Sequence, residues 1–552
     1  MRAAEAVGRV IAGLASDAAP LPVFGLVGSG NFHVTNGLIA GGARFVAARH
    51  EGGAVMMADA WARTTGRVGL LSVHQGPGLT NAMTGITEAA KSRTPLLVLA
   101  AEATDRRSNF YLDVAGLAAS VGAAHERVHS PATAVADAAR AYRTALDRRT
   151  VILSLPLDVQ AGQCELTEPP PAPETFPAAP NVAAVAALTN SLESARRPVF
   201  ICGRGARSAG RDWNRPARRA LENLADRCGA LLATSAAARG LFAGNPWSLD
   251  VSGGFASPVA AELIASADLI VAWGCTLNMW TTRHGALIGP RTRIIQVDDD
   301  PAAFGVNRAV EYGVLGNVAD VAMAATDAIA ASGRITPSVM RKNHLPRELH
   351  WRSVPYEDES DGERIDPRTL SIVLDDLLPA ERTVAVDSGN FMGYPSMFLS
   401  VPDEAGFCFT QAFQSVGLGL ASAIGAALAR PDRLTVAALG DGGALMGVSE
   451  LETLVRLAIP MVVVIYDDEA YGAEVHHFAP DGDPLDTVRF PAADIAAIAR
   501  GFGCEGVLVR RIEDLAAVRV WLAGSRDRPL VIDAKITSSH GSWWLEEAFR
   551  GH

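Results

Sequence analysis

Residues 434–443 read LTVAALGDGG, and residues 461–472 read MVVVIYDDEAYG. Each segment begins with an apolar run that lacks polar alternation, which is typical of a strand buried on both faces of a parallel sheet. The first run ends in a glycine-rich turn, where backbone N–H groups can approach phosphate oxygens. Asp441 in that turn would repel a phosphate unless a divalent cation lay between them. The two segments therefore predict a parallel sheet that carries a metal-bound phosphate group.

The same pattern recurs along the 552-residue chain. Similar apolar runs alternate with helical patterns at 23–27, 68–73, 95–101, 150–156, 198–203, 230–235, 269–274, 293–298, 383–389 and 529–536. Proline-dense residues 167–181 and polar residues 333–367 divide the chain between these runs. We therefore expect an α/β protein with three doubly wound domains of mainly parallel sheets, at residues 1–166, 182–332 and 365–552.

The composition limits the classes of function. Hydrophobic residues make up 49% and charged residues 20% of the chain, which are values of a globular protein. The net charge of −11 argues against a nucleic-acid partner, because such proteins need a basic face. No apolar run is long enough to cross a membrane. The six cysteines are dispersed, as is typical of reduced thiols, so we expect a cytoplasmic protein.

The two segments quoted first resemble the cofactor motif of thiamine-diphosphate (ThDP, or thiamine pyrophosphate) enzymes, especially acetolactate synthase, pyruvate decarboxylase and benzoylformate decarboxylase. That motif is Gly-Asp-Gly, followed about 27 residues later by the second of two asparagines; in this chain 468 − 441 = 27. The resemblance implies ThDP with a Mg²⁺ ion bound by Asp441, Asp468 and the carbonyl of Ala470. The cofactor contacts that it implies are Gly440, Asp441, Gly442, Gly443, Asp468, Ala470, Tyr471 and Gly472.

The chain departs from this motif, because Asp467-Asp468 replaces the usual pair of asparagines. Aspartate can still bind Mg²⁺, but it adds a negative charge beside a diphosphate. We hypothesise that the extra charge tightens metal binding and weakens the phosphate contacts. The alternative is a nucleotide-type turn followed by two unrelated surface acids.

A second motif lies near the N-terminus. Arg49-His50-Glu51 and the loop at residues 76–81, GPGLTN, resemble the pyrimidine-binding domain of the same family. The resemblance implies that Glu51 binds the pyrimidine ring and drives the tautomer that removes the thiazolium C2 proton. The alternative is a helix N-terminal glutamate favoured by the helix dipole. In the family this glutamate meets the metal motif across a subunit interface, which implies a homodimer at minimum, or a homotetramer.

Two further segments match cofactor contacts of the family. Val416 stands where relatives carry a bulky apolar residue that bends the cofactor, and the carbonyl of Gln414 would accept from the 4′-amino group. An ordinary core valine at a helix start is the alternative for Val416. Gly389 and Asn390 follow the run at 383–389 and are assigned to the diphosphate side.

Other residues could choose the reaction. His74 directly follows a predicted strand, and benzoylformate decarboxylase-like enzymes carry a histidine in this loop, where imidazole can relay protons. Gln75 and His33 are weaker candidates. Glu474 lies six residues after Asp468, an offset at which pyruvate decarboxylase-like enzymes carry a glutamate. For each of these residues the alternative is a structural or solvent-facing role.

The resemblance implies a ThDP-dependent, non-oxidative decarboxylase or carboligase that acts on a 2-oxo acid or related carbonyl compound through an enamine. One alternative is an acetolactate-synthase-type carboligase with structural FAD in the central domain. For that cofactor, Gly203-Arg204-Gly205 is only a weak phosphate-loop signal. The other alternative is a non-catalytic paralogue, which only the Asp467-Asp468 replacement favours.

Overall fold

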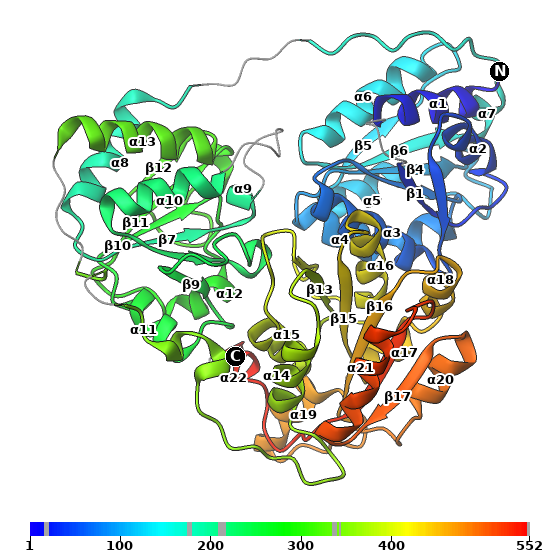
Figure 1. The fold of residues 1–552 in the computed structure, drawn as a ribbon. Helices are drawn as coiled ribbons and strands as arrows, with labels where there is room; N and C mark the ends of the chain where they lie inside the picture. Colours follow the sequence, from blue (N-terminus) through cyan, green and yellow to red (C-terminus); the bar gives the residue numbers. More distant parts are fainter. Residues whose placement is uncertain (16–20, 174–178, 208–216, 334–338, 342–343, 549–552) are drawn as a thin grey trace.

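Three α/β domains, each built around a six-stranded sheet, follow one another along the chain in the computed structural model (Figure 1). The structure describes residues 1–15, 21–173, 179–207, 217–333, 339–341 and 344–548. All assigned strand pairings within the three sheets are parallel. The predicted fold class is therefore confirmed.

Each sheet places strands side by side that are not consecutive in the chain. Across the first sheet the order is β2 (Arg44–Ala47), β1 (Pro22–Gly25), β3 (Gly69–Val73), β4 (Leu96–Glu102), β6 (Thr150–Pro156) and β5 (Ala124–Arg127). Across the second it is β12 (Tyr312–Leu315), β11 (Arg293–Asp298), β10 (Leu269–Trp273), β7 (Pro198–Cys202), β8 (Leu231–Thr234) and β9 (Ser248–Val251). Across the third it is β14 (Phe407–Phe409), β13 (Arg382–Val386), β15 (Leu434–Gly440), β16 (Met461–Asp467), β18 (Leu530–Lys535) and β17 (Glu505–Val509).

Helices cover the faces of these sheets (Figure 1). The first domain has α1 (Ala3–Ala15), α2 (Phe32–Ala40), α3 (Glu51–Thr65), α4 (Pro77–Lys91), α5 (Val114–Ser120), α6 (Ala134–Leu146) and α7 (Leu157–Ala161). The central domain has α8 (Val182–Ser194), α9 (Arg204–Arg207), α10 (Ala217–Cys228), α11 (Pro258–Ala265), α12 (Met279–Thr282) and α13 (Val318–Ser332). The third has α14 (Pro367–Leu377), α15 (Gly393–Phe398), α16 (Gly419–Ala429), α17 (Asp441–Met446), α18 (Glu450–Arg456), α19 (Gly472–Phe478), α20 (Ile495–Phe502), α21 (Ala516–Ala523) and α22 (Trp543–Ala548).

The sheet orders place one switch point in each domain, where consecutive strands leave in opposite directions. It lies between β1 and β3, between β7 and β10, and between β13 and β15. Open parallel sheets bind ligands in the crevice beyond the carboxyl ends of strands at such points. The fold thus provides three positions for ligands, one in each domain.

The first and third domains share one hydrophobic core. Helices α3 and α16 meet so closely that a Cβ at Gly425 would lie 2.2 Å from the carbonyl oxygen of Met57. Leu420, Ala423 and Ile424 of α16 belong to the same buried cluster as the core of the first sheet. A glycine at this crossing therefore allows two helix backbones from different domains to approach each other.

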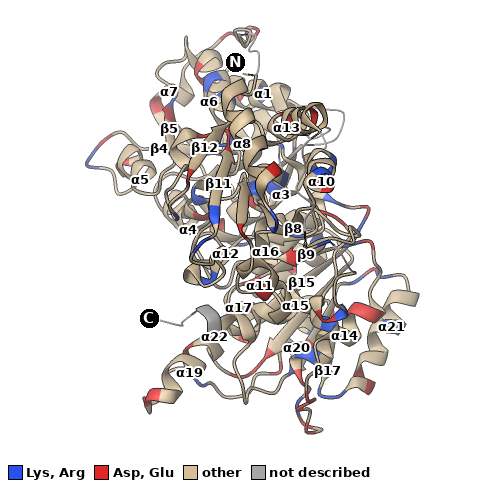
Figure 2. Ribbon diagram, turned by 90° about the vertical axis from the view of Figure 1, so that its left-hand side faces the viewer, with Lys and Arg blue, Asp and Glu red and all other residues tan. Residues whose placement is uncertain are grey.

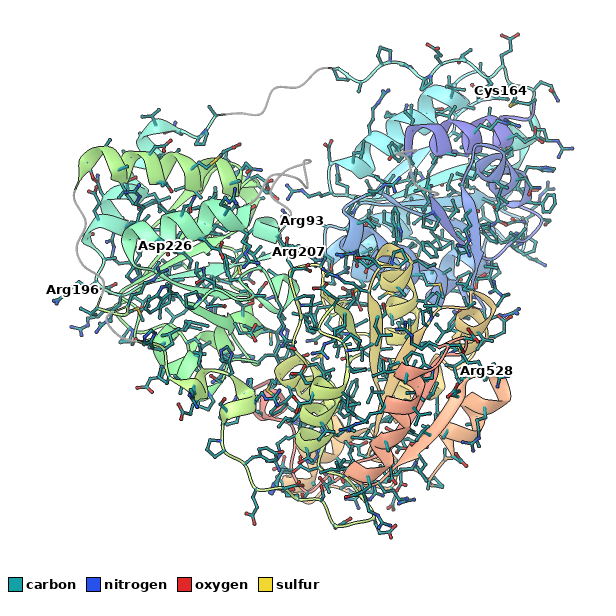
Figure 3. All side chains as sticks on the ribbon, viewed as in Figure 1. Arg93, Cys164, Arg196, Arg207, Asp226 and Arg528 are labelled. Carbon is teal, nitrogen blue, oxygen red and sulfur yellow. The ribbon has the colours of Figure 1, made fainter. Side chains whose placement is uncertain are left out.

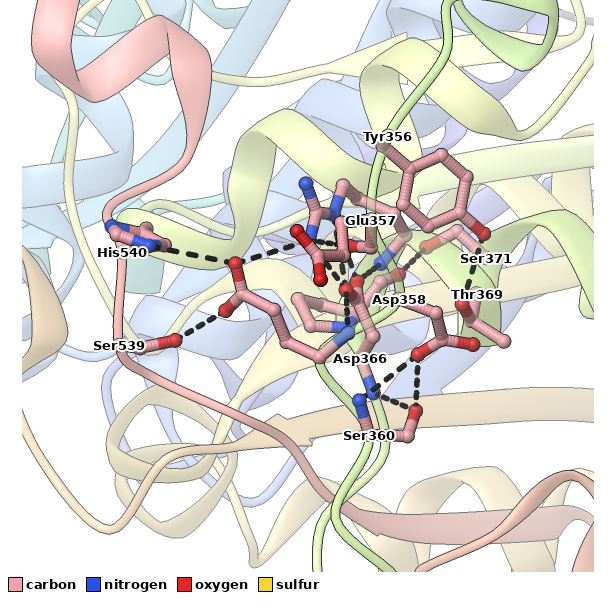
Figure 4. A network of polar contacts seen from close by, with 12 residues as sticks. Tyr356, Glu357, Asp358, Ser360, Asp366, Thr369, Ser371, Ser539 and His540 are labelled. Carbon is pink, nitrogen blue, oxygen red and sulfur yellow. Dashed lines mark hydrogen bonds and ion pairs between the residues drawn. The ribbon is translucent and has the colours of Figure 1, made fainter.

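A polar network fixes the crossing into the third domain (Figure 4). Asp366 accepts hydrogen bonds from the backbone N–H groups of Arg368 and Glu359, at 2.8 and 3.1 Å. Glu359 also contacts the C-terminal segment, through Ser539 and through His540 at 3.5 Å. The polar stretch that the sequence predicts as a surface crossing thus joins the start of α14 to the end of the chain. Residues 334–338 and 342–343 of that stretch, and 174–178 of the proline-dense stretch, lie outside the described residues.

Charge is spread over the molecule. Figure 2 shows acidic and basic residues interspersed along the helices and strands on this side, with no single basic face. Within the described part of the chain, every helix is too short or too polar to cross a bilayer. The interspersed charge is typical of the surface of a globular protein.

Candidate active site

Two aspartates meet at the carboxyl ends of neighbouring strands of the third sheet. Asp441 begins α17 directly after β15, and Asp468 follows β16, which pairs with β15. Burial raises the pKa of Asp441, and the charge of Asp468 raises it further. Burial is also the main cause that raises the pKa of Asp468. A buried and a half-buried carboxylate that repel each other form a site that a divalent cation would stabilise.

The neighbouring backbone fits the same group. The antiparallel bridge beside Ala470 uses Tyr471 N–H to Val488 O (2.8 Å) and Phe490 N–H to Glu469 O (2.9 Å), so neither bond occupies the carbonyl of Ala470. Among the described residues, no three His, Cys, Asp or Glu side chains form a metal cluster. The two aspartates would therefore need carbonyl and phosphate oxygens to complete an octahedral site.

Glycines keep this turn open. A Cβ at Gly443 would lie 2.5 Å from Oδ2 of Asp387, and a Cβ at Gly472 would lie 2.1 Å from Oδ2 of Asp468. The predicted contacts Gly440 and Gly442 would, with a Cβ, meet aromatic rings at 3.1 and 2.8 Å. A side chain at any of these four positions would collide with a neighbour, and glycine leaves the backbone N–H groups of the turn accessible, so the residues present fit a diphosphate–Mg²⁺ group.

Asp467, the first residue of the acidic pair, has a partner of its own. It forms a buried ion pair with Lys535 of β18, whose Nζ also lies 3.4 Å from Asp533. The strand register places Asp467 opposite Lys535. Lys535 was not predicted from the sequence, although two charges in the otherwise apolar run at 529–536 are a signal, since buried charges require partners.

The segment before α16 lies over the glycine turn. Asp387, to which the sequence assigned no role, accepts from Gly417 N–H at 3.0 Å, and burial raises its pKa to about 6. Val416 is 43% exposed and lies 3.4 Å from the position of a Cβ at Gly443. Val416 is therefore not a core residue of the single chain. Gln414 has a φ of 58°, a conformation that non-glycine residues adopt mainly where the surroundings impose it.

Gly389 and Asn390 lie at the switch point after β13. Gly389 has a φ of 141°, which favours glycine. Asn390 is buried and is held by the C-terminal segment: Ser542 N–H donates to its Oδ1 at 2.9 Å, and Trp544 Nε1–H donates to its carbonyl at 2.9 Å. The side-chain oxygen of Asn390 is therefore already bonded within the chain.

The predicted pyrimidine-binding residues gather at the switch point of the first sheet. Glu51 begins α3, and its Oε2 accepts from Asn81 Nδ2 at 3.0 Å. His74 follows β3, and its Nδ1 accepts from Gly30 N–H at 3.2 Å. Burial lowers the pKa of His74, and the charge of Glu51 offsets part of that effect. The ring is therefore neutral near pH 7, with its proton on Nε2.

The weaker candidates lie in different settings. Gln75 is buried, and its Oε1 has no hydrogen-bond partner among the described residues. His33 contacts Arg2 and the ring of Phe32. Glu474 is an exposed residue in the first turn of α19. Gln75 and His33 thus belong to the first domain, whereas Glu474 belongs to the third.

The two groups of cofactor residues lie on separate domains of the chain. Exposed apolar side chains flank both. Beside the glycine turn these are Phe413, Val416, Leu445, Met446 and Tyr471, and in the first domain they are Val27, Phe32 and Phe110. A large apolar surface that is open to water in one chain marks a surface for another molecule.

A cavity of about 660 Å³ lies at the switch point of the central sheet, and Gln414 of the proposed cofactor segment is among its lining residues. Its lining includes the glycine turns after β7 and β10, at 203–205 and 274–276, and Asp298 at the end of β11. Arg93 and Arg207, from the first and central domains, lie on facing edges and also line it (Figure 3). Burial lowers the pKa of Arg204 to about 9, and neighbouring Arg63 contributes. Arg283, which follows the second glycine turn in the sequence, donates to the carbonyls of Gly253 and Ala256.

Comparison with known proteins agrees with this architecture. Three family models match: the N-terminal TPP binding domain of thiamine pyrophosphate enzymes at residues 6–127, the central domain at 185–325, and the C-terminal TPP binding domain at 387–534. These stretches contain the first, second and third sheets in turn, apart from some of their strands.

Curated proteins align over most of the chain. A sulfoacetaldehyde acetyltransferase of Alcaligenes xylosoxydans is 28% identical, over 89% of this chain and 86% of its own length. An acetolactate synthase large subunit of Parasynechococcus marenigrum is 28% identical, over 86% and 79%. A probable 2-ketoarginine decarboxylase of Pseudomonas aeruginosa is 29% identical, over 93% and 90%. With the paired half-sites and the three matching domains, these relatives show that the chain belongs to the thiamine pyrophosphate-dependent enzyme family of decarboxylases and carboligases.

Proposed function

We propose that the protein is a non-oxidative ThDP-dependent decarboxylase or carboligase that cleaves or joins a 2-oxo acid at the carbonyl carbon. The observation that carries this proposal is the pair of half-sites. One holds Glu51 and His74, the other holds Asp441 and Asp468, and both are flanked by exposed apolar side chains. A homodimer would join each half-site to the complementary one of its partner and cover these side chains. Two such dimers would form a homotetramer, which is the alternative assembly.

The metal and cofactor assignments follow from the donors. Asp441, Asp468 and the carbonyl of Ala470 would bind Mg²⁺, and Gly440, Gly442, Gly443 and Gly472 would surround the diphosphate. When bound, ThDP supplies a stabilised carbanion for carbonyl chemistry. We also propose a cytoplasmic location, which the six free cysteines support.

The chain's own residues would manage protons. Glu51 would hold a proton at the pyrimidine ring, with Asn81 fixing its carboxylate at 3.0 Å. His74 carries its proton on Nε2, because Nδ1 accepts from Gly30 N–H, so the neutral ring would donate a hydrogen bond from Nε2 to the substrate's carbonyl oxygen. Glu474 is the proposed proton donor to the product carbon. Gln75 and His33 would bind substrate groups rather than transfer protons.

The central cavity favours a second bound molecule. Its glycine turns, its arginines and Asp298 provide groups for phosphates and for ribose hydroxyls, and about 660 Å³ suits a dinucleotide such as FAD. If FAD is structural, as in an acetolactate-synthase-type carboligase, the purified protein is yellow and releases flavin on denaturation. Colourless active protein that takes up no added FAD would exclude this cofactor.

A non-catalytic paralogue is the remaining alternative. The Asp467-Asp468 replacement is the feature that favours it, but Lys535 neutralises Asp467 within the chain. Calorimetry with ThDP and Mg²⁺ separates the enzyme from the non-catalytic paralogue. We expect saturable binding of ThDP to the enzyme and none to a paralogue that has lost its cofactor site.

The test of the reaction is a screen of 2-oxo acids for CO₂ release, with and without aldehyde acceptors. Glu51→Gln should reduce every activity found by at least about tenfold, since it removes the ionisable group that fixes the tautomer. Thr80→Ala, next to Asn81 near the start of α4, is the matched control. Full activity in Glu51→Gln would remove the assigned role.

A further inference from the structure

Two buried carboxylates reach from one catalytic domain into the other within a single chain, in opposite directions. Glu450 of α18 accepts hydrogen bonds on Oε1 from the backbone N–H groups of Arg49 (3.0 Å) and His50 (3.1 Å) in the first domain. Glu88 of α4 accepts from Ala412 N–H on Oε1 (3.0 Å) and from Phe413 N–H on Oε2 (2.5 Å) in the third domain. We call these contacts the Glu450 clamp and the Glu88 clamp.

Each clamp holds the two residues that directly precede a cofactor residue. The Glu450 clamp ends at His50, the residue before Glu51. The Glu88 clamp ends at Phe413, the residue before Gln414, whose carbonyl and near neighbour Val416 face the cofactor in the proposed site. A carboxylate that accepts two consecutive N–H groups fixes a backbone more firmly than a neutral partner does.

The clamps are built into the interior. Glu450 is 3% exposed, and its other oxygen accepts from Thr453 Oγ1 at 2.7 Å. Gly53 makes room for it, because a Cβ there would lie 2.4 Å from Glu450 Oε1. Glu88 is completely buried and also accepts from Arg63 Nη2 at 2.7 Å and from Ser92 Oγ at 3.0 Å. Burying such carboxylates costs free energy unless every oxygen is bonded, and here each one is.

The two clamps differ in which carboxylate oxygens accept the N–H groups, so a change to glutamine should affect them differently. Both N–H groups of the Glu450 clamp bond to one oxygen, whereas those of the Glu88 clamp bond to different oxygens. A glutamine amide has one accepting oxygen and one donating NH₂ group. Glutamine can therefore replace Glu450 and keep both bonds, with its NH₂ group toward Thr453. Glutamine at position 88 must place a donor against an N–H group.

We propose that Glu88 and Glu450 are positioning residues of the ThDP site: Glu88 sets the segment of Gln414 and Val416, and Glu450 sets Glu51. The proposal rests on the proposed function. In the proposed dimer, Glu51 and the Gln414 segment of one chain belong to different cofactor sites. The Glu450 clamp and the Glu88 clamp of that chain would therefore position groups in two different sites. The packing of the first domain on the third would then adjust both sites without touching substrate.

The experiment compares purified holoenzyme variants in three measurements: amide hydrogen exchange of residues 49–51 and 409–417, ThDP affinity by calorimetry in Mg²⁺, and kcat and KM for the best substrate. In Glu88→Gln we expect faster exchange at residues 412–413 and a kcat lower by about 10- to 100-fold with little change in KM, because small misplacements cost rate rather than binding. Ser92→Ala removes one bond to Glu88 but neither clamp bond, and its exchange at 412–413 should match the parent.

Substitutions of Glu450 provide a second test, in which glutamine should preserve the clamp and alanine should remove it. Glu450→Ala should lose rate as Glu88→Gln does, with faster exchange at residues 49–51, and Glu450→Gln should recover most of it. If Glu88→Gln does not fold, this pair decides the proposal alone. Parent-like exchange and kcat in folded Glu88→Gln, or a Glu450→Gln as slow as Glu450→Ala, would overturn it. A parent that binds no ThDP would instead refute the proposed function.

Discussion

Lys535 forms an ion pair with Asp467 inside the third sheet, in the register that sets the two residues opposite each other on β18 and β16. The pair leaves Asp468 as the member of the acidic couple that faces the proposed metal. Asp467 also accepts from Glu469 N–H at 3.0 Å, at the start of the loop that carries Ala470. The ion pair thus supports the geometry of the metal loop.

Lys535→Met should destabilise the protein by about 3–5 kcal/mol, since it leaves the buried carboxylates of Asp467 and Asp533 without their cation. Urea denaturation of the apoprotein measures this change. The double variant Lys535→Met with Asp467→Asn removes both charges and should recover much of the loss. Equal stability of the single variant and the parent would show that the pair contributes nothing.

Asp468→Asn restores the residue usual in relatives. We expect weaker Mg²⁺ binding and tighter ThDP binding, each by about tenfold, because one negative charge leaves the metal and no longer repels the diphosphate. Calorimetric titration of each ligand checks both directions. Asp481→Asn, an equal change of charge on an exposed turn after α19, serves as the control. Unchanged affinities in Asp468→Asn would refute the hypothesis about the extra charge.

The lowered pKa of His74 predicts a particular pH dependence. Its ring stays neutral as the pH falls to the ordinary histidine value of about 6.5. Activity should therefore fall only at lower pH, when protonation turns Nδ1 from an acceptor into a donor and breaks its bond from Gly30 N–H. The kcat/KM profile should lose this acidic limb in His74→Gln.

His129→Gln changes a histidine that pairs with Asp137 on the same domain and should keep the acidic limb. A limb that persists in His74→Gln, or one that begins well above pH 6.5 in the parent, would contradict the assignment of His74 as the titrating residue that acts in its neutral form.

The sequence predicted the interior of each sheet and missed its margins. Every one of the twelve predicted apolar runs became a strand, whereas β2, β5, β9, β12, β14 and β17 were not foreseen. Those six are the outer strands of the three sheets. An outer strand is partly exposed and short, as the mixed burial of Arg44–Ala47 shows, so it carries no continuous apolar run.

The candidate site was predictable where one segment of sequence carries the chemistry. The turn at 440–443 and the spacing of 27 residues from Asp441 to Asp468 predicted that these two aspartates meet, since strand-end residues of adjacent parallel strands lie together. Lys535, Glu88 and Glu450 were missed because their partners are 68, 324 and 401 residues away. Spacing along the chain carries no signal for such contacts.

The most direct test of the central claim, that each site combines Glu51 of one chain with Asp441 of another, is complementation between Glu51→Gln and Asp441→Ala. Each variant alone should keep at most about a tenth of the parent activity. After the two are unfolded together and refolded in equal amounts, half of the dimers are mixed and contain one intact site, so about a quarter of the parent activity should return. A mixture as inactive as its components would place both residues in one chain's site and contradict the account.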